Sequence, residues 1–170
     1  MKLYVMRHGP AEDDAASGRD ADRALTHSGR ERTREVARAL VANEEAPLAI
    51  VSSPLVRALQ TAEIVAAVTE LDKRGAAVEV RREMGPGGDA LGLVAELLRT
   101  GRKRVMVVGH EPDVSLLVHS LTGASPEAGL SKSMVVGVRV DPEASGARAS
   151  DLSAKLRFVL EPKSLAWQRA

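Results

Sequence analysis

Two arginines and two histidines follow three short apolar segments of this sequence. Arg7 and His8 come directly after "KLYVM", Arg57 lies just beyond "AIVSSP", and His110 follows "RVMVVG". An arginine side chain offers forked, charged donors to the oxygens of a phosphate group. A neutral imidazole can attack phosphorus, and a protonated one can stabilise the charge on the phosphoryl oxygens. Brought together, these residues would make a site for a phosphate dianion.

The positions of these residues suggest a division of roles. His8 is the candidate nucleophile, because Gly9 lets a bound group come close to the backbone. Arg57 falls in the first turn of a predicted helix, where free N–H groups and the helix dipole favour anions. His110 is the candidate stabiliser of charge. Each residue alone would more often be structural, but their occurrence at three strand ends favours a shared site.

Composition and motifs exclude several other kinds of site. The 170 residues include no cysteine, which excludes disulfides, thiolate metal sites and cysteine-nucleophile phosphatases. "HEPDV" lacks the second histidine of a zinc-protease motif and no GxxxxGK[ST] loop occurs, so we expect neither a metal nor a cofactor. A net charge of +1 with 2% aromatic residues argues against nucleic-acid binding. No apolar run is long enough for a signal peptide or a membrane span, so we expect a cytoplasmic protein.

Short apolar runs alternate with helical stretches along the chain. The patterns predict strands at 2–6, 47–54, 76–81, 104–108, 133–140 and 153–160, and helices at 25–42, 55–68, 89–100 and from 112 onward. This alternation predicts a single domain over 1–170, a three-layer α/β/α sandwich with a mostly parallel sheet. The last two strands are expected as an antiparallel pair at an edge, and Trp167 is expected to pack on the domain. In such sheets ligands bind beyond the carboxyl ends of the strands.

Four segments together resemble the histidine phosphatase superfamily, which has the phosphoglycerate mutase-like fold. They are "MRHG" (6–9), "LTHSGRERT" (25–33), "SSPLVRALQTAE" (52–63) and "VVGHEPDVS" (107–115), in the family's order. "DADRALTHSG" and "GPGGDALGLVAELL" most resemble the SixA-type phosphohistidine phosphatases. The resemblance implies a transient phosphohistidine on His8. It also implies that phosphate is bound by a set of neighbouring groups, namely Arg7, Gly9, Arg57 and His110, with Arg23 beside the pocket.

Many superfamily members use a Glu or Asp as general acid, and here Glu83 and Asp89 are the candidates. SixA-type proteins resemble this one in lacking a securely placed acid. An ester leaves as an alkoxide and needs a proton, whereas phosphohistidine leaves as imidazole, whose conjugate acid has a pKa of about 6.5. General acid help is worth about 10²–10⁴ in rate. Its absence would therefore penalise esters far more than N–P bonds.

The sequence leaves three functions open. The first is a metal-independent phosphatase for phosphohistidine on a protein, such as a phosphotransfer domain. The second is a phosphatase for a small phosphoester, with Glu83 or Asp89 as the acid, and the third is a phospho-dependent binding module without turnover. The first is favoured because the short chain leaves little length to cover the site. We expect no nucleic-acid or membrane partner, and a monomer is favoured.

Overall fold

The computed structural model describes residues 1–124, 126–141 and 149–169. Its centre is a seven-stranded sheet in the order β3-β2-β4-β1-β5-β6-β7. The strands are β1 (Lys2–Arg7), β2 (Ala49–Ser52), β3 (Val78–Val80), β4 (Arg104–Gly109), β5 (Val135–Val140), β6 (Ala154–Leu160) and β7 (Trp167–Arg169). The helices are α1 (His27–Ala42), α2 (Val56–Val68), α3 (Ala90–Arg99) and α4 (Asp113–Thr122), with short 3-10 turns that include η1 (Asp20–Asp22) and η3 (Arg82–Met84).

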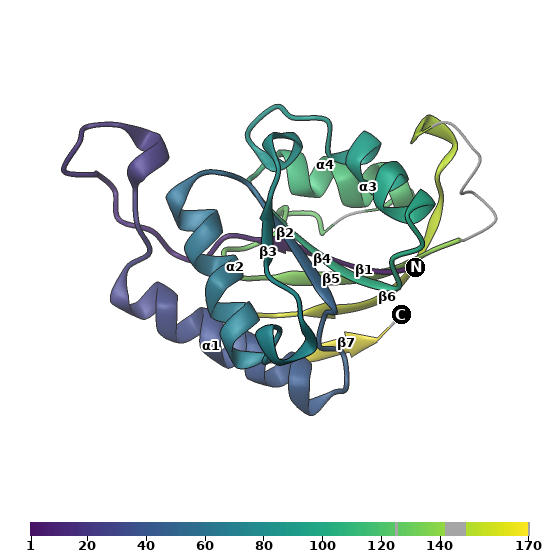
Figure 1. The fold of residues 1–170 in the computed structure, drawn as a ribbon, viewed down its shortest axis with the longest axis horizontal. Coiled ribbons are helices and arrows are strands. Elements are labelled where there is room, and N and C mark those ends of the chain that lie inside the picture. Colours follow the sequence, from purple (N-terminus) through teal and green to yellow (C-terminus); the bar gives the residue numbers. More distant parts are fainter. Residues whose placement is uncertain (125, 142–148, 170) are drawn as a thin grey trace.

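The helices form two layers on opposite faces of the sheet (Figure 1). Because side chains alternate across a strand, Leu3 and Val5 of β1 pack with α3 and α4, while Tyr4 and Met6 pack with α1 and α2. All four side chains are fully buried. Strands β1 and β4 are therefore apolar on both faces, which is typical of the interior of an α/β sheet. The expected α/β/α sandwich is confirmed.

The sheet is parallel in one half and antiparallel in the other. Strands β3, β2, β4 and β1 run parallel to one another, and the pairs β1–β5, β5–β6 and β6–β7 are antiparallel. The pairing of β5 with β6 agrees with the predicted antiparallel pair. The sheet edge, however, is β7, which the sequence analysis did not predict, because three largely exposed residues carry no strand periodicity.

Trp167 packs on the domain, as expected. Its ring stacks on Phe158 of β6, with 4.1 Å between ring centroids. Phe158 in turn lies over Gly137 of β5, where a Cβ atom would come within 2.2 Å of the phenyl ring. Glycine at 137 thus provides the space that lets the C-terminal strand be anchored by an aromatic pair.

Glu45 joins the beginning of β1 to the antiparallel half of the sheet. Its carboxylate accepts hydrogen bonds from Tyr4 Oη at 2.7 Å, from Lys2 Nζ at 3.3 Å and from Arg157 Nη1 at 3.0 Å. Burial alone would raise the pKa of Glu45, but Arg157, Tyr4 and Lys2 outweigh it and lower the pKa from 4.5 to about 2. The ionised form is therefore the one that stabilises the fold.

Glu45→Gln is expected to lower the free energy of unfolding by about 2 kcal/mol at neutral pH, because charged hydrogen bonds in a nearly buried site are lost. Urea denaturation would measure it, with Glu63→Gln on the exposed surface of α2 as the control. A carboxylate whose pKa is lower in the folded protein than in the unfolded chain stabilises the fold at a pH above the pKa of the unfolded chain. It loses that effect as the pH falls through the pKa of the folded protein. The difference between wild type and variant should therefore shrink between about pH 4.5 and pH 2. A constant difference over that range would contradict this account.

Candidate active site

The carboxyl ends of β1, β2 and β4 bring three segments of the chain side by side. The N–H of His8 donates to the carbonyl of Gly109 at 3.1 Å, and the N–H of Ser53 donates to the carbonyl of Val108 at 3.0 Å. These bonds continue the sheet beyond the strands. The rings of His8 and His110 lie 5.1 Å apart, centroid to centroid. The structure therefore brings His8 and His110 together at the ends of their strands, as predicted.

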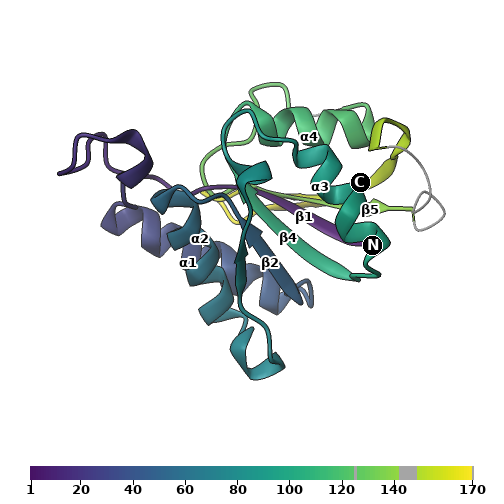
Figure 2. The same ribbon diagram turned by 45° about the horizontal axis from the view of Figure 1, so that its top comes forward.

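The connections that leave β1 and β4 diverge at this point. After β1 the chain continues into α1 on one face of the sheet, and after β4 it continues into α4 on the other (Figures 1 and 2). A parallel sheet has a crevice where neighbouring strands send their connections to opposite faces. His8 and His110 occupy that position.

His8 is held in one tautomer by its own backbone. Its Nδ1 lies 2.7 Å from the carbonyl oxygen of Gly9, and a carbonyl can only accept, so Nδ1 carries the proton. In the neutral ring Nε2 then has a free lone pair, and it makes no hydrogen bond to any described residue. Burial lowers the pKa of His8 to about 3, and the nearby His110, Arg57 and Arg7 add to the effect. The ring is consequently neutral, and Nε2 nucleophilic, across the physiological pH range.

His110 is oriented by Ser53. Its Nε2 lies 2.8 Å from Ser53 Oγ, and that hydroxyl oxygen already accepts from the N–H of Leu55 at 3.2 Å. With the Ser53 hydroxyl as donor, Nε2 accepts and the ring proton is on Nδ1. Within the described part of the chain this Nδ1 is buried without a partner. Burial, with Arg57 next, lowers the pKa of His110 to about 4.

Two arginines face the same crevice. Arg57, in the first turn of α2 and 7% exposed, is a nearly buried cation. Arg7, the last residue of β1, donates from Nη1 to the carbonyl of Leu130 at 2.8 Å. Its Nε is buried and has no partner among the described residues. Buried polar groups are normally satisfied, so Arg7 Nε and His110 Nδ1 are two unpaired atoms that the polar groups of a ligand would satisfy.

Arg57 and Arg23 share the carboxylate of Asp20. Arg57 donates from Nη2 to Asp20 Oδ2 at 3.0 Å and from Nη1 to the Asp20 carbonyl at 2.9 Å. Arg23 donates from Nη1 to Asp20 Oδ1 at 2.8 Å and from Nε to the carbonyl of Glu12 at 2.6 Å. The structure therefore places Arg23 beside Arg57, through the carboxylate that they share. Sequence reasoning missed Asp20, which lies in a stretch without strand or helix periodicity.

Comparison with known proteins identifies the family. The model of the histidine phosphatase superfamily (branch 1) matches residues 3–83. Phosphohistidine phosphatase SixA of Escherichia coli (strain K12) is 33% identical over 150 residues, covering 86% of this chain and 89% of the relative. The chain belongs to the histidine phosphatase superfamily. It is accordingly a phosphatase.

Solved structures agree with this assignment. The structure of the protein histidine phosphatase SixA complexed with tungstate has a TM-score of 0.81 and 29% identity, covering 98% of this chain and all of the other. A mycobacterial glucosyl-3-phosphoglycerate phosphatase has a TM-score of 0.65 at 20% identity, covering 91% of this chain and 96% of the other. The second likeness shows a shared fold alone.

Gly9 of this histidine phosphatase is surrounded by protein rather than open space. A Cβ atom there would lie 2.7 Å from Thr33 Oγ1 and 3.2 Å from Ser133 Oγ. Its N–H donates to Thr61 Oγ1 at 3.0 Å. The structure thus gives a packing reason for the glycine, in addition to the predicted approach of a bound group: helix α1 and the loop before β5 come too close to position 9 for a side chain.

The two candidate general acids have structural partners. Glu83 Oε1 accepts from Arg81 Nη2 at 2.6 Å, and this hydrogen bond lowers the pKa of Glu83. Asp89 caps α3, where Oδ1 accepts from the N–H of Gly92 at 2.8 Å. Arg81 also holds Glu96 through Nη1 and Nη2 at 2.9 and 2.8 Å. Neither Glu83 nor Asp89 hydrogen-bonds to His8 or His110 within the described residues.

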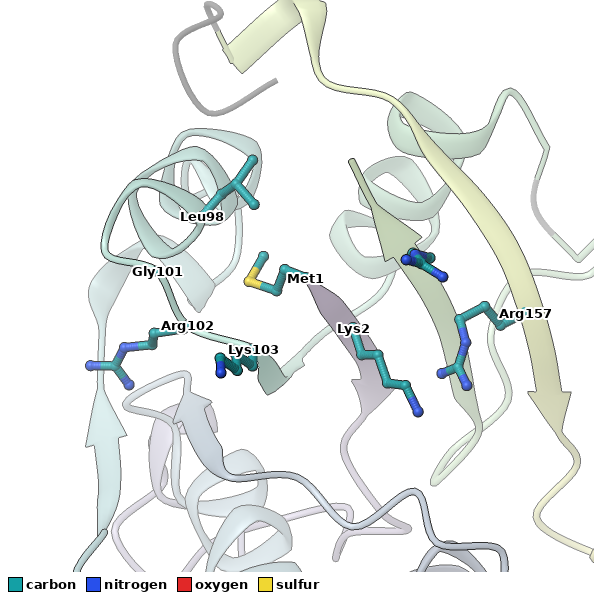
Figure 3. A pocket seen from close by; sticks show the side chains of 8 residues that line it. Met1, Lys2, Leu98, Gly101, Arg102, Lys103 and Arg157 are labelled. Atoms are coloured by element: carbon teal, nitrogen blue, oxygen red, sulfur yellow. The ribbon is translucent and has the colours of Figure 1, made fainter. Parts of the chain in front are cut away.

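Other features lie apart from this site. A cavity at the amino-terminal end of β1 is lined by basic and apolar side chains, among them Lys2, Arg102, Lys103 and Arg157 (Figure 3). The other two histidines, His27 and His119, are exposed. In residues 1–124, 126–141 and 149–169, no three His, Asp or Glu side chains gather as a metal site would require. No helix of that same part has the length and hydropathy of a membrane span.

Proposed function

We propose that this phosphatase removes the phosphoryl group from phosphohistidine on a protein, by way of a phosphohistidine on His8. The observation that carries the proposal is the hydrogen bond from His8 Nδ1 to the Gly9 carbonyl. It leaves the Nε2 lone pair free beside two arginines and a second histidine. An unprotonated ring nitrogen in a cationic crevice is what attack on a phosphoryl group requires.

The reaction takes two displacements. In the first, the substrate binds with its other ring nitrogen protonated, His8 Nε2 forms a bond to phosphorus, and the bond from phosphorus to the substrate nitrogen breaks, so that the substrate leaves as neutral imidazole. In the second, water attacks the phosphorus of phospho-His8, and the P–N bond breaks to give inorganic phosphate and free His8. The negative charge on the phosphoryl oxygens is balanced in both steps by donors from the protein, namely Arg7, Arg57 and His110 Nδ1.

The substrate class is supported by the structural partners of the two candidate acids. Glu83 is held by Arg81 and Asp89 caps a helix, so neither is placed to protonate an alkoxide. Imidazole needs no such help. The relative from E. coli is itself named a phosphohistidine phosphatase, and it aligns with most of this chain. A small phosphoester substrate would instead require one of the two carboxyl groups to be released from its partner.

Side-by-side phosphate release from a phosphohistidine protein and from p-nitrophenyl phosphate tests this choice. Wild type is expected to favour the phosphohistidine protein, and Glu83→Gln should change either rate by less than about threefold, because a general acid would contribute about 10²–10⁴. Glu96→Gln, which loses the same Arg81 partner on α3, is the matched control. Loss of ester turnover in Glu83→Gln alone would identify an ester phosphatase. Binding of the phosphoprotein without phosphate release would identify a binding module.

A further inference from the structure

The carboxylate of Asp20 accepts hydrogen bonds from guanidinium groups that would otherwise be available to a phosphoryl group. One oxygen accepts from Arg57 and the other from Arg23, at 3.0 and 2.8 Å. This two-oxygen bridge between two guanidinium groups is the arrangement that an oxyanion such as phosphate adopts with paired arginines. Both arginines lower the pKa of Asp20, Arg23 more than Arg57. The bridging group is therefore an anion at neutral pH.

The segment that carries Asp20 is tied to the domain by few contacts. Asp20 lies in η1, a turn of three residues, within the segment 10–25 that projects away from the sheet (Figures 1 and 2). The base of this segment is closed by the bridge between Ala11 and Leu25 and by the bond from Glu12 N–H to the Ala24 carbonyl. The Asp20 side chain is 61% exposed, whereas that of Arg57 is 8% exposed. The carboxylate can thus move into solvent, while the arginine cannot.

We infer that Asp20 is an internal competitor of the phosphoryl group for Arg57 and Arg23, and so sets the affinity and specificity of the site. This inference rests on the proposed function, because it takes Arg57 as a phosphate-binding residue. Each bound phosphoryl group must first displace an anion that is covalently part of the enzyme. Phosphate alone is then held weakly and leaves readily after hydrolysis.

The competition has a consequence for substrate choice. A small phosphomonoester has only its phosphoryl group and a few other atoms to offset the displacement of Asp20. A phosphorylated protein can offset it with contacts outside the crevice. Asp20 would therefore discriminate against small phosphoanions without touching the reacting nitrogen of His8. The opposite role, in which Asp20 only holds Arg57 in place, predicts the opposite effect of its removal.

Asp20→Asn tests the inference, because it removes the charge and keeps the backbone carbonyl that accepts from Arg57 Nη1. The probes are inorganic phosphate and tungstate, with dissociation constants measured by calorimetry. The variant is expected to bind both about 1.5- to fivefold more tightly, the range for loss of a partly exposed ion pair. The KM for p-nitrophenyl phosphate should fall by a similar factor, with kcat within about twofold. Asp22→Asn is the matched control, since Asp22 in the same turn pairs with Arg19 and Ser17 instead.

The outcomes separate this inference from the proposed function. Unchanged or weaker anion binding in Asp20→Asn, with wild type still binding, would overturn the competitor role and leave the phosphatase proposal standing. An equal gain in Asp22→Asn would also overturn it, because the effect would then come from the charge of the loop in general. Failure of both wild type and Asp20→Asn to bind either anion would overturn the phosphate site itself, and the inference with it.

Discussion

His8→Ala is expected to lower kcat on a phosphohistidine protein by about 10⁴-fold or more, as removal of a covalent nucleophile does. The His8 side chain supplies a ring nitrogen, Nε2, that has no hydrogen-bond partner among the described residues, whereas His110 Nε2 is paired with Ser53 Oγ. Water cannot replace the imidazole, because the two-step route would be lost altogether. Phosphate binding should persist in the variant, since the arginines and His110 remain. Phosphate release at saturating substrate and calorimetric phosphate binding would measure the two effects.

A matched control exists on the surface of the same fold. His119 lies exposed in α4, away from the crevice, so His119→Ala should retain wild-type kcat. If His8→Ala kept more than about a hundredth of the wild-type kcat, attack by this residue would not be the main route. The remaining reaction would then have to be direct hydrolysis by water.

Arg57→Ala is expected to lower kcat/KM by about 10²–10³-fold, the usual cost of removing one charged or polar group that stabilises a transition state. The arginine is nearly buried beside both histidines, so its charge acts at short range with little screening. Loss of that positive charge would also raise the pKa of His110 and of His8, since Arg57 lowers both. Steady-state kinetics with the phosphohistidine protein would measure the effect.

The control for this variant is Arg38→Ala, an exposed arginine on α1. Arg57→Lys adds a second comparison, because lysine keeps the charge and loses the forked donors. An effect of less than about tenfold for Arg57→Ala would show that Arg57 belongs to the fold rather than to the reaction. A circular dichroism melt would show whether either variant is destabilised.

The core of the site could be predicted because it depends on the strongest signals in the sequence. Buried strands such as β1 and β4 are continuous apolar runs, and a parallel sheet gathers their carboxyl ends at one edge. His8 and His110 follow those runs directly, so their meeting needed no knowledge of side-chain packing. The family resemblance added the roles.

Other parts of the structure depend on contacts between residues that are far apart in the sequence, and the sequence patterns did not predict these contacts. Asp20 meets Arg57 across 37 positions, through a loop without periodicity. From the sequence, Glu83 and Asp89 were equal candidates for the general acid. The structure shows that Glu83 accepts a hydrogen bond from Arg81 and that Asp89 accepts one from the N–H of Gly92. β7 has only three residues, and it forms because Trp167 can stack on Phe158. In each case the deciding interaction is tertiary, which local patterns do not encode.

Passage of the phosphoryl group through His8 can be observed by rapid-quench trapping of the phosphoenzyme. The protein would be mixed with a phosphohistidine substrate, quenched in alkali, digested and examined by mass spectrometry. The account predicts an acid-labile phosphate on His8 in wild type that is absent in His8→Ala. Phosphate on another residue, or turnover with no phosphoenzyme at any time point, would contradict it.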